Sequence, residues 1–467
     1  MKKKFFIPFL GLLLVISSCT NDLYQDPITS KELSIFLSNE TEVEEYVNAV
    51  YASLQSTGLY GLYLPAFAEI PSDNTYDEVP ANDDGIYGQL DEFTTIPTNG
   101  IVTLTWRHAY QGIQKANVVL NRIDKITFKD DKVKLARKGE MKFIRALMYF
   151  NLVRLYGDVP LATEETSDPN KYFGQGRTAQ AKVYDQVKKD LTEAIDLLPE
   201  TSSQPGKVIK TAAQTLLAKV YLTLNSYPEA KTLLQSVVNS GKHTLLAKPQ
   251  DIFSLSNENN KEIIFAVQFA SGINGNSEGS TMFQQFSPSG TQSGAKGHNL
   301  PTKNLYNLYS SNDLRKGIFV TLTSSGIPFN NKISKPITVI TDGGSDFVVL
   351  RYADVLLMLA EVENESGNTD QASVNLNLVR NRAGLPNTSA NTQKDLREAI
   401  AQERKLELVG EGHRWFDLLR TKTAVEVMNK WFKENGKLIT IDEHNLLMPI
   451  PQSQVNTDPA IKQNPGY

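Results

Sequence analysis

The segment from 403 to 420 has the densest set of side chains that could do acid–base chemistry. It reads ERKLELVGEGHRWFDLLR and contains Glu403, Glu407, Glu411, His413 and Asp417. Glycoside hydrolysis requires two carboxyl groups that face each other across the scissile bond, and a metal hydrolase requires ligands at fixed spacing. The charges here follow helical spacing instead, until Gly410 and Gly412 interrupt the helix. The pattern favours a buried or half-buried ion network that braces the fold, with Arg404 or Arg414 as the partner of Glu407.

The remainder of the chain shows none of the common catalytic motifs. The five histidines are scattered, with no HExxH pair, and neither a GxSxG nucleophile elbow nor a GxxxxGK[ST] phosphate loop occurs. The pair Asp83-Asp84 has calcium-binding chemistry but lacks EF-hand spacing, so a solvated turn is expected there. We therefore expect no enzymatic activity, no metal and no cofactor.

The composition is that of a folded, mildly acidic protein. The chain has 467 residues, of which 40% are hydrophobic and 21% charged, with a formal net charge of -4. Nucleic-acid binding rests on neutralising phosphates, and the chain has no tract rich in lysine and arginine. We therefore expect no nucleic-acid partner.

The amino terminus predicts secretion and a lipid anchor. The stretch MKKKFFIPFLGLLLVISSC has a basic start, an apolar run and small residues, as a secretory signal over residues 1–18 does. The apolar run is shorter than the roughly 20 residues of a membrane span. Its end, ISSC, resembles a bacterial lipobox, and Cys19 is the only cysteine. We expect acyl chains on Cys19 and a polar tether over 19–40; the alternative is a plain signal peptide with a chance cysteine.

An internal repeat indicates helical hairpins. Residues 216–241 align with residues 358–384, each as an amphipathic helix, a short turn and a second helix of the tetratricopeptide type. Small alanines fit the close crossing of two helices. The aligned pairs are Leu217 with Leu359, Ala218 with Ala360, Val220 with Val362, Ala230 with Ala372, Leu234 with Leu376 and Val237 with Val379.

Two less regular hairpins precede these. They pair 142–156 with 183–198, and 43–54 with 106–123. Such hairpins cannot bury their apolar faces alone, so neighbouring hairpins must stack. The predicted fold is mostly α, with about four tetratricopeptide-like hairpins, long loop-rich insertions and a few short strands.

Two insertions interrupt the helical pattern, over 57–104 and about 244–350. Long loops of this kind are usually either functional or disordered. The second insertion carries strand signals at 262–269 and 347–350. We divide the mature chain into an amino-terminal part, 41–260, which holds the first ligand loop, and a carboxy-terminal part, 261–467, which holds the last hairpin.

Six stretches in order resemble the SusD/RagB family of surface lipoproteins from Bacteroidetes-type bacteria. The resemblance covers nearly the whole mature chain and implies a SusD-like fold in which the charged segment packs the carboxy-terminal part against the repeats. It also implies an outer-membrane protein, facing the cell exterior, that has no catalytic role. Such a protein captures nutrient oligomers as the lid of a SusC-type TonB-dependent transporter, with its repeat side facing that transporter. The stretches are AYQGIQKANVVLNRI (109–123), GEMKFIRALMYFNLVRLYGDVPL (139–161), LRYADVLLMLAEVENESG (350–367), NLVRNRAGLP (377–386), ERKLELVGEGHRWFDLLR (403–420) and LLMPIPQSQVNTDPAIKQNPGY (446–467).

The family's ligand region corresponds to loops within 60–100 and 270–310. Aromatic rings that stack on sugars, and polar side chains that bond hydroxyl groups, make the candidate set. Among the three tryptophans, Trp106 and Trp415 are expected in the core, which leaves Trp431. The candidates are Asp73, Asn74, Tyr76, Tyr87, Phe283, Phe286, Asn299 and Trp431.

Several starch- or fructan-binding relatives use exposed tryptophans, which this chain largely lacks. The favoured hypothesis is therefore a glycan-capturing lid whose ligand is held by tyrosine and phenylalanine. A peptide-capturing lipoprotein, as in the RagB branch, is the alternative with the same scaffold. A glycoside hydrolase and a bare tetratricopeptide adaptor are the hypotheses from other classes.

Overall fold

Helical hairpins form most of the protein. The computed structural model describes residues 36–168, 170–336 and 338–467. The predicted signal segment, most of the tether and Cys19 lie outside these residues. All four predicted hairpins are confirmed. They are α1 (Glu40–Ser53) with α4 (Gly100–Arg122), α5 (Asp131–Tyr156) with α6 (Gln180–Leu197), α7 (Lys210–Thr223) with α8 (Tyr227–Asn239), and α11 (Tyr352–Glu365) with α12 (Thr369–Arg382).

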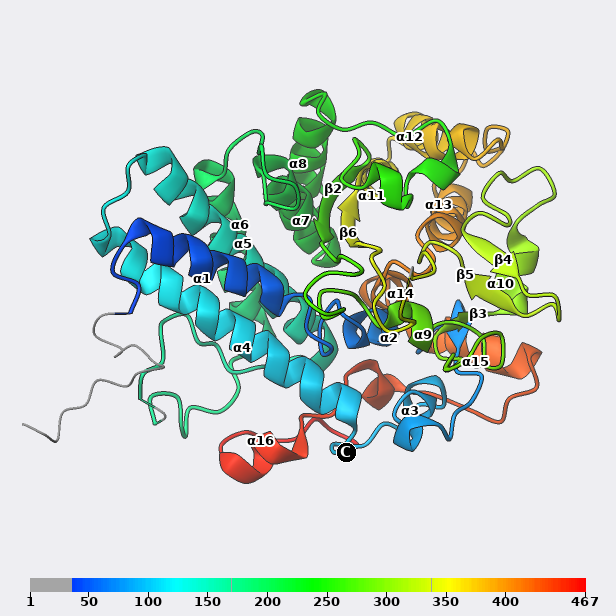
Figure 1. Cartoon of the computed structure of the whole chain (residues 1–467). Coiled ribbons are helices and arrows are strands. Elements are labelled where there is room, and N and C mark those ends of the chain that lie inside the picture. The colour runs from blue at the N-terminus through cyan, green and yellow to red at the C-terminus, as the bar shows by residue number, and fades with distance from the viewer. Residues whose placement is uncertain (1–35, 169, 337) are drawn as a thin grey trace, which may run out of the picture.

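The hairpins stack into one helical layer. Helix α4 packs on α5, α6 on α7, and α8 on α11, so the row continues from the first hairpin to the last although a long insertion separates the final two in sequence. Figure 1 shows this row running from α1 and α4 through α7 and α8 to α11 and α12. The aligned alanines Ala218, Ala230, Ala360 and Ala372 are all fully buried, as the close crossing of helices requires.

Local sequence sets the ends of these helices. The Asn39 side chain caps α1 by accepting a hydrogen bond from the backbone N–H of Glu42, and Asn99 caps α4 in the same way. Helix α5 ends at Gly157, whose φ of 73° lies in the left-handed region that glycine tolerates. The helices therefore begin and end where their capping residues stand.

The remaining helices and the strands belong to the insertions and the carboxy-terminal region. The two predicted strands form β2 (Ile263–Val267) and β6 (Phe347–Arg351), which pair antiparallel, with Ala266 opposite Val348. The other pairs are β1 (Thr75–Tyr76) with β3 (Leu300–Pro301), and β4 (Val320–Leu322) with β5 (Pro328–Asn330). The remaining α-helices are α2 (Tyr63–Glu69), α3 (Gly88–Asp91), α9 (Met282–Gln285), α10 (Lys303–Leu308), α13 (Gln393–Glu407), α14 (Arg414–Arg420), α15 (Ala424–Glu434) and α16 (Gln452–Thr457).

The β1–β3 pair joins the two insertions. Tyr76 lies opposite Leu300, and the backbone N–H of Thr302 donates to the carbonyl of Asn74. Loops far apart in the sequence are thus fixed side by side at the end of the molecule opposite α1 (Figure 1).

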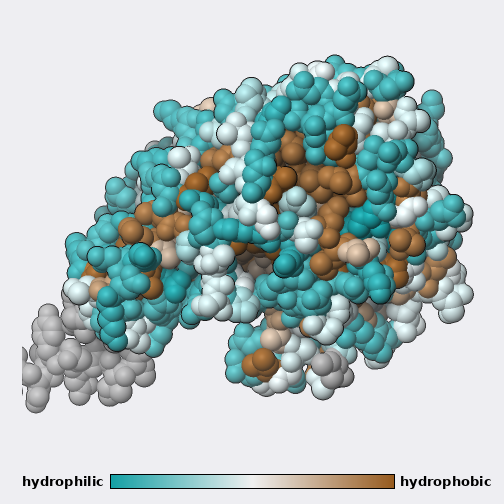
Figure 2. Space-filling view, turned by 90° about the horizontal axis from the view of Figure 1, so that it is seen from above, coloured by the Kyte–Doolittle hydropathy of each residue, from teal (hydrophilic) through white to brown (hydrophobic). Residues whose placement is uncertain are grey.

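The face of the molecule seen in Figure 2 is mostly polar. In Figure 2, hydrophilic residues cover most of the visible face, and apolar residues gather in hollows between them. Within the described ranges, no helix combines the length and apolarity needed to span a bilayer.

Candidate functional site

The charged segment 403–420 forms a buried ion network around Glu407. The Glu407 carboxylate accepts hydrogen bonds from Arg351 at 2.7 Å and Arg315 at 2.9 Å, and it also accepts one from Arg382. Burial alone would raise the pKa of this carboxyl, but the guanidiniums of Arg382, Arg351 and Arg315 outweigh burial and lower it. The prediction of a brace is confirmed, since these arginines come from the second insertion, from β6 and from α12.

The partners predicted for Glu407 were wrong. Arg404 lies 2.8 Å from Asp354 and 2.9 Å from Asp417, and Arg414 lies 2.7 Å from Asp73. Arg404 and Glu407 are three residues apart on α13, a spacing that allows a pair, but the Arg404 guanidinium binds Asp354 and Asp417 instead. The true partners are distant in sequence, so local spacing could not identify them.

The two glycines of this segment turn the chain between α13 and α14. Gly410 and Gly412 have φ values of 76° and 79°, which glycine adopts without a steric cost. The N–H groups of Gly412 and His413 donate to Glu69 of α2 at 2.9 and 3.1 Å. The predicted helix break is therefore confirmed, and it holds the carboxy-terminal region against the first insertion.

Five of the eight predicted ligand residues lie in the interior. Asp73 is bonded to Arg414 and Lys405, and Tyr87 stacks on His298 with ring centroids 3.9 Å apart. Little of these side chains reaches solvent, so their placement suits holding the loops together better than contacting a ligand. The five are Asp73, Asn74, Tyr87, Phe286 and Asn299.

His298 joins the two insertions at this point. Its Nδ1 lies 2.8 Å from Asp77 and its Nε2 lies 2.8 Å from Asp83. Asp83 also accepts a hydrogen bond from Lys296 at 2.9 Å. The expected solvated turn is therefore only half right, because Asp84 is exposed while Asp83 is engaged. Nothing in the sequence around His298 distinguishes it from the other histidines.

The other three candidates are half-buried and belong to different elements. Tyr76 belongs to β1, and Trp431 of α15 packs on Phe432 with centroids 5.3 Å apart. Of the eight candidates, only Phe283 lines the cavity described below. The expectation that Trp106 and Trp415 are core residues is confirmed by exposures of 3% and 0%.

A cavity of about 810 Å³ opens among three stretches of the second insertion. Its volume lies within the usual range of small-molecule sites. Residues of the loop 270–310 line it, whereas no residue of the loop 60–100 does. Sequence reasoning missed the stretches around 249–256 and 328–335, which carry no recognisable motif. The cavity is lined by Pro249, Gln250, Phe253, Ser254, Leu255, Ser256, Phe283, Ser287, Pro288, Thr291, Gln292, Ile318, Thr323, Phe329, Asn331, Ile333, Ser334 and Lys335.

Three half-buried phenylalanines supply the aromatic surface of this cavity. Phe253 follows the short helix Pro249–Asp251, Phe283 belongs to α9, and Phe329 belongs to β5. The Phe253 ring is fixed from behind, since it packs edge-on against Phe319 with centroids 5.7 Å apart. Rings held in this way can stack on the apolar face of a ligand without a large loss of side-chain entropy.

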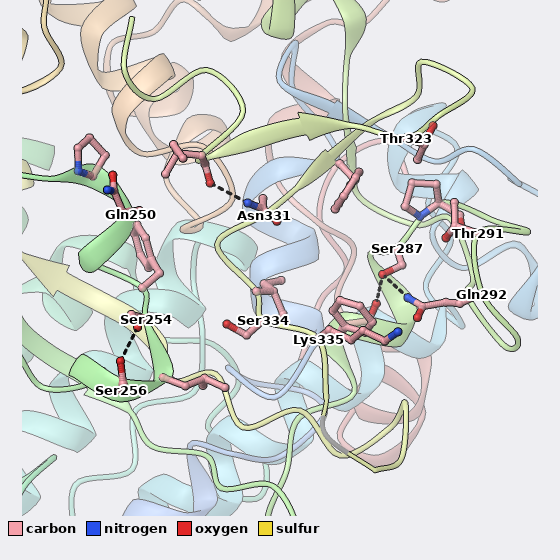
Figure 3. A pocket seen from close by; sticks show the side chains of 18 residues that line it. Gln250, Ser254, Ser256, Ser287, Thr291, Gln292, Thr323, Asn331, Ser334 and Lys335 are labelled. Carbon is pink, nitrogen blue, oxygen red and sulfur yellow. Dashed lines mark hydrogen bonds between the residues drawn. The ribbon is translucent and has the colours of Figure 1, made fainter.

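Several polar groups of the cavity wall are already engaged within the protein. The Ser287 hydroxyl donates to the carbonyl of Phe283 at 2.6 Å and accepts from Gln292 at 3.3 Å. Asn331 donates to the carbonyl of Ile318 at 3.2 Å. These bonds, drawn in Figure 3, stiffen the wall.

Three other polar side chains of the cavity wall have no hydrogen-bond partner among the described residues. Among the described residues, the side chains of Gln250, Ser334 and Lys335 make no hydrogen bond or ion pair. In Figure 3, Gln250 lies on one side of the cavity, Ser287 and Gln292 lie on the other, and Ser334 and Lys335 lie between them. The described lining contains no carboxylate, so it offers stacking and hydrogen bonding but no acid–base pair of the kind that glycoside hydrolysis uses.

Stacked helical hairpins that carry loop-built insertions place the protein in the class of helical-repeat proteins. A model described as "SusD family" matches residues 321–467, and one described as "Starch-binding associating with outer membrane" matches residues 26–222. The chain belongs to the SusD/RagB family.

Similar proteins span the whole chain. SusD-like protein P2 of Formosa agariphila is 26% identical and covers 100% of both chains. The starch-binding protein SusD of Bacteroides thetaiotaomicron is 22% identical and covers 97% of this chain and 96% of its own. A solved laminarin-binding SusD-like protein is 28% identical, with a TM-score of 0.80 over 92% of this chain and 100% of its own.

Fold similarity extends to lower identity. Surface glycan-binding protein A of Bacteroides thetaiotaomicron, solved with laminarihexaose, has a TM-score of 0.77 at 22% identity over 91% of this chain and 100% of its own. The mostly helical, SusD-like fold predicted from the sequence is therefore confirmed.

Proposed function

We propose that this protein captures oligosaccharides in the cavity of the second insertion and delivers them to a SusC-type TonB-dependent transporter in the outer membrane. The observation that carries the binding step is the juxtaposition of three phenylalanine rings with the unpaired side chains of Gln250, Ser334 and Lys335. Membership of a glycan-binding family supports the ligand class, and the absence of carboxylates from the described lining supports binding without hydrolysis.

The anchor and the partner belong to the same proposal. Acyl chains on Cys19 would confine the protein to the outer membrane, facing the cell exterior. Confinement raises its effective concentration beside a transporter in the same membrane. The stacked repeats of α1 to α12 would then present a broad face to that transporter, while the cavity lies in the loop-built part of the molecule (Figure 1).

Calorimetric titration of the mature protein against neutral and acidic oligosaccharides tests the binding step. Phe283→Ala should weaken binding about tenfold or more, because it removes one stacking surface from a fixed site. Phe173→Ala is the matched control, since Phe173 is 56% exposed and lies outside the cavity. Binding of peptides but of no oligosaccharide would favour the peptide-capturing alternative.

A further inference from the structure

The described wall of the cavity carries a positive charge and no negative one. Among its described lining residues, Lys335 is the single ionisable side chain. Lys335 is exposed and makes no ion pair with any described residue. Figure 3 shows its amine turned toward the side where Ser287 and Gln292 lie. A ligand in this cavity therefore meets one ammonium group that no protein carboxylate neutralises.

The charges behind the wall do not reverse this sign. The Phe253 ring has the Lys332 ammonium 5.0 Å from its centroid and the Arg351 guanidinium 5.8 Å away. Both cations are paired with Glu411. Both cations behind the wall are thus engaged in ion pairs, whereas Lys335 at its surface is not.

Two carboxyl groups near Phe253 have raised pKa values. Glu258 and Asp346 line a small neighbouring cavity that shares the Phe253 ring. Burial raises the pKa of Asp346 to about 7 and raises the pKa of Glu258. A carboxyl with a raised pKa holds its proton to higher pH, so these groups oppose an anionic ligand less than ordinary carboxylates would.

We propose that the cavity selects anionic saccharides, with the Lys335 ammonium bonding a carboxylate or sulfate group of the sugar. The phenylalanine rings stack on the sugar rings, and Gln250 and Ser334 bond hydroxyl groups. The inference rests on the proposed function and adds a ligand charge to it. A charge-assisted hydrogen bond to an ammonium is stronger than a neutral one, so a single lysine changes selectivity measurably.

Titrations with three oligosaccharides of equal length test whether the cavity prefers a carboxylate, a sulfate ester or no charge. Oligogalacturonate carries carboxylates, a carrageenan oligomer carries sulfate esters, and a laminarin oligomer is neutral. We expect at least one acidic oligomer to bind more tightly than the neutral one, with an affinity that falls as salt rises from 50 to 300 mM. Preference for oligogalacturonate identifies a carboxylate as the bonded group, and preference for the carrageenan oligomer identifies a sulfate ester.

Variants of Lys335 test the residue itself. Lys335→Gln should lower the affinity for the preferred acidic oligomer about five- to tenfold and leave the neutral oligomer unchanged, while Lys335→Arg should retain most of the affinity. Lys394→Gln, at an exposed lysine outside the cavity, is the control.

The outcomes separate this inference from the proposed function. Neutral binding at least as tight as acidic binding, sensitive to Phe283→Ala but not to Lys335→Gln, overturns the charge selectivity and leaves glycan capture intact. Failure of every oligosaccharide to bind overturns both.

Discussion

Replacing Glu407 with glutamine should destabilise the protein without altering the ligand cavity. The substitution keeps the shape of the side chain but removes the charge shared by Arg315, Arg351 and Arg382. Breaking a buried ion pair costs about 3–5 kcal/mol. Each arginine retains another carboxylate, such as Glu262 for Arg351 and Arg382, so we expect about 3 kcal/mol, at the lower end of that range.

Differential scanning calorimetry measures this loss. Unfolding entropy scales with chain length, so for a chain of 467 residues a loss of about 3 kcal/mol corresponds to a fall in Tm of about 3 °C. The control is Glu398→Gln on the same helix, because Glu398 is exposed and should change stability by less than about 0.5 kcal/mol.

The pH dependence gives a second readout of the same substitution. Because the pKa of Glu407 is lowered in the folded state, its contribution to stability is present above the ordinary value of 4.5 and is lost as pH falls through the folded pKa. The difference between wild type and Glu407→Gln should therefore be largest near neutral pH and shrink in acid. Equal Tm values for both proteins at pH 7 would refute the brace.

Further predictions concern the loops and the anchor. Burial raises the pKa of Glu69 to about 7, so the contribution of Glu69 to wild-type stability should fall by about 3 kcal/mol as pH rises from 4.5 to 7.5. Glu69→Gln should remove this pH-dependent contribution, so urea titrations should show a different change of its unfolding free energy between pH 4.5 and 7.5 from that of the wild type. The same change in both proteins would contradict the raised pKa of Glu69. His298→Phe keeps an aromatic ring at this position but removes the contacts of His298 with Asp77 and Asp83, so hydrogen exchange should quicken in residues 72–87; unchanged protection would contradict the role of His298 in joining the two insertions. Cys19→Ser should release the protein from membranes, and a mutant that still sediments with membranes would disprove the anchor.

The repeats could be predicted because their information is local. Apolar periodicity and small alanines such as Ala218 and Ala360 specify two packed helices with little reference to the remainder of the chain. The strands at 262–269 and 347–350 were also visible as short apolar runs. Their pairing as β2 and β6 depends on contacts across more than half of the second insertion, which periodicity does not encode.

The candidate ligand cavity was harder to predict, because it too depends on contacts between distant parts of the chain. Asp73 and Tyr87 have the residue types of a sugar site, yet the fold uses them to bind Arg414 and to stack on His298. Phe253 and Lys335 lie in loop sequence without a recognisable motif, and the fold places both in the wall of the same cavity. Residue type alone cannot distinguish a polar or aromatic loop side chain that holds the loop from one that faces a ligand.

A crystal structure of the mature protein with its preferred oligosaccharide tests the binding account most directly. The account predicts sugar rings against Phe253, Phe283 and Phe329, with an acidic group of the sugar within hydrogen-bond distance of Lys335. An oligosaccharide bound elsewhere, for instance against Tyr76 or Trp431 with this cavity empty, would contradict it.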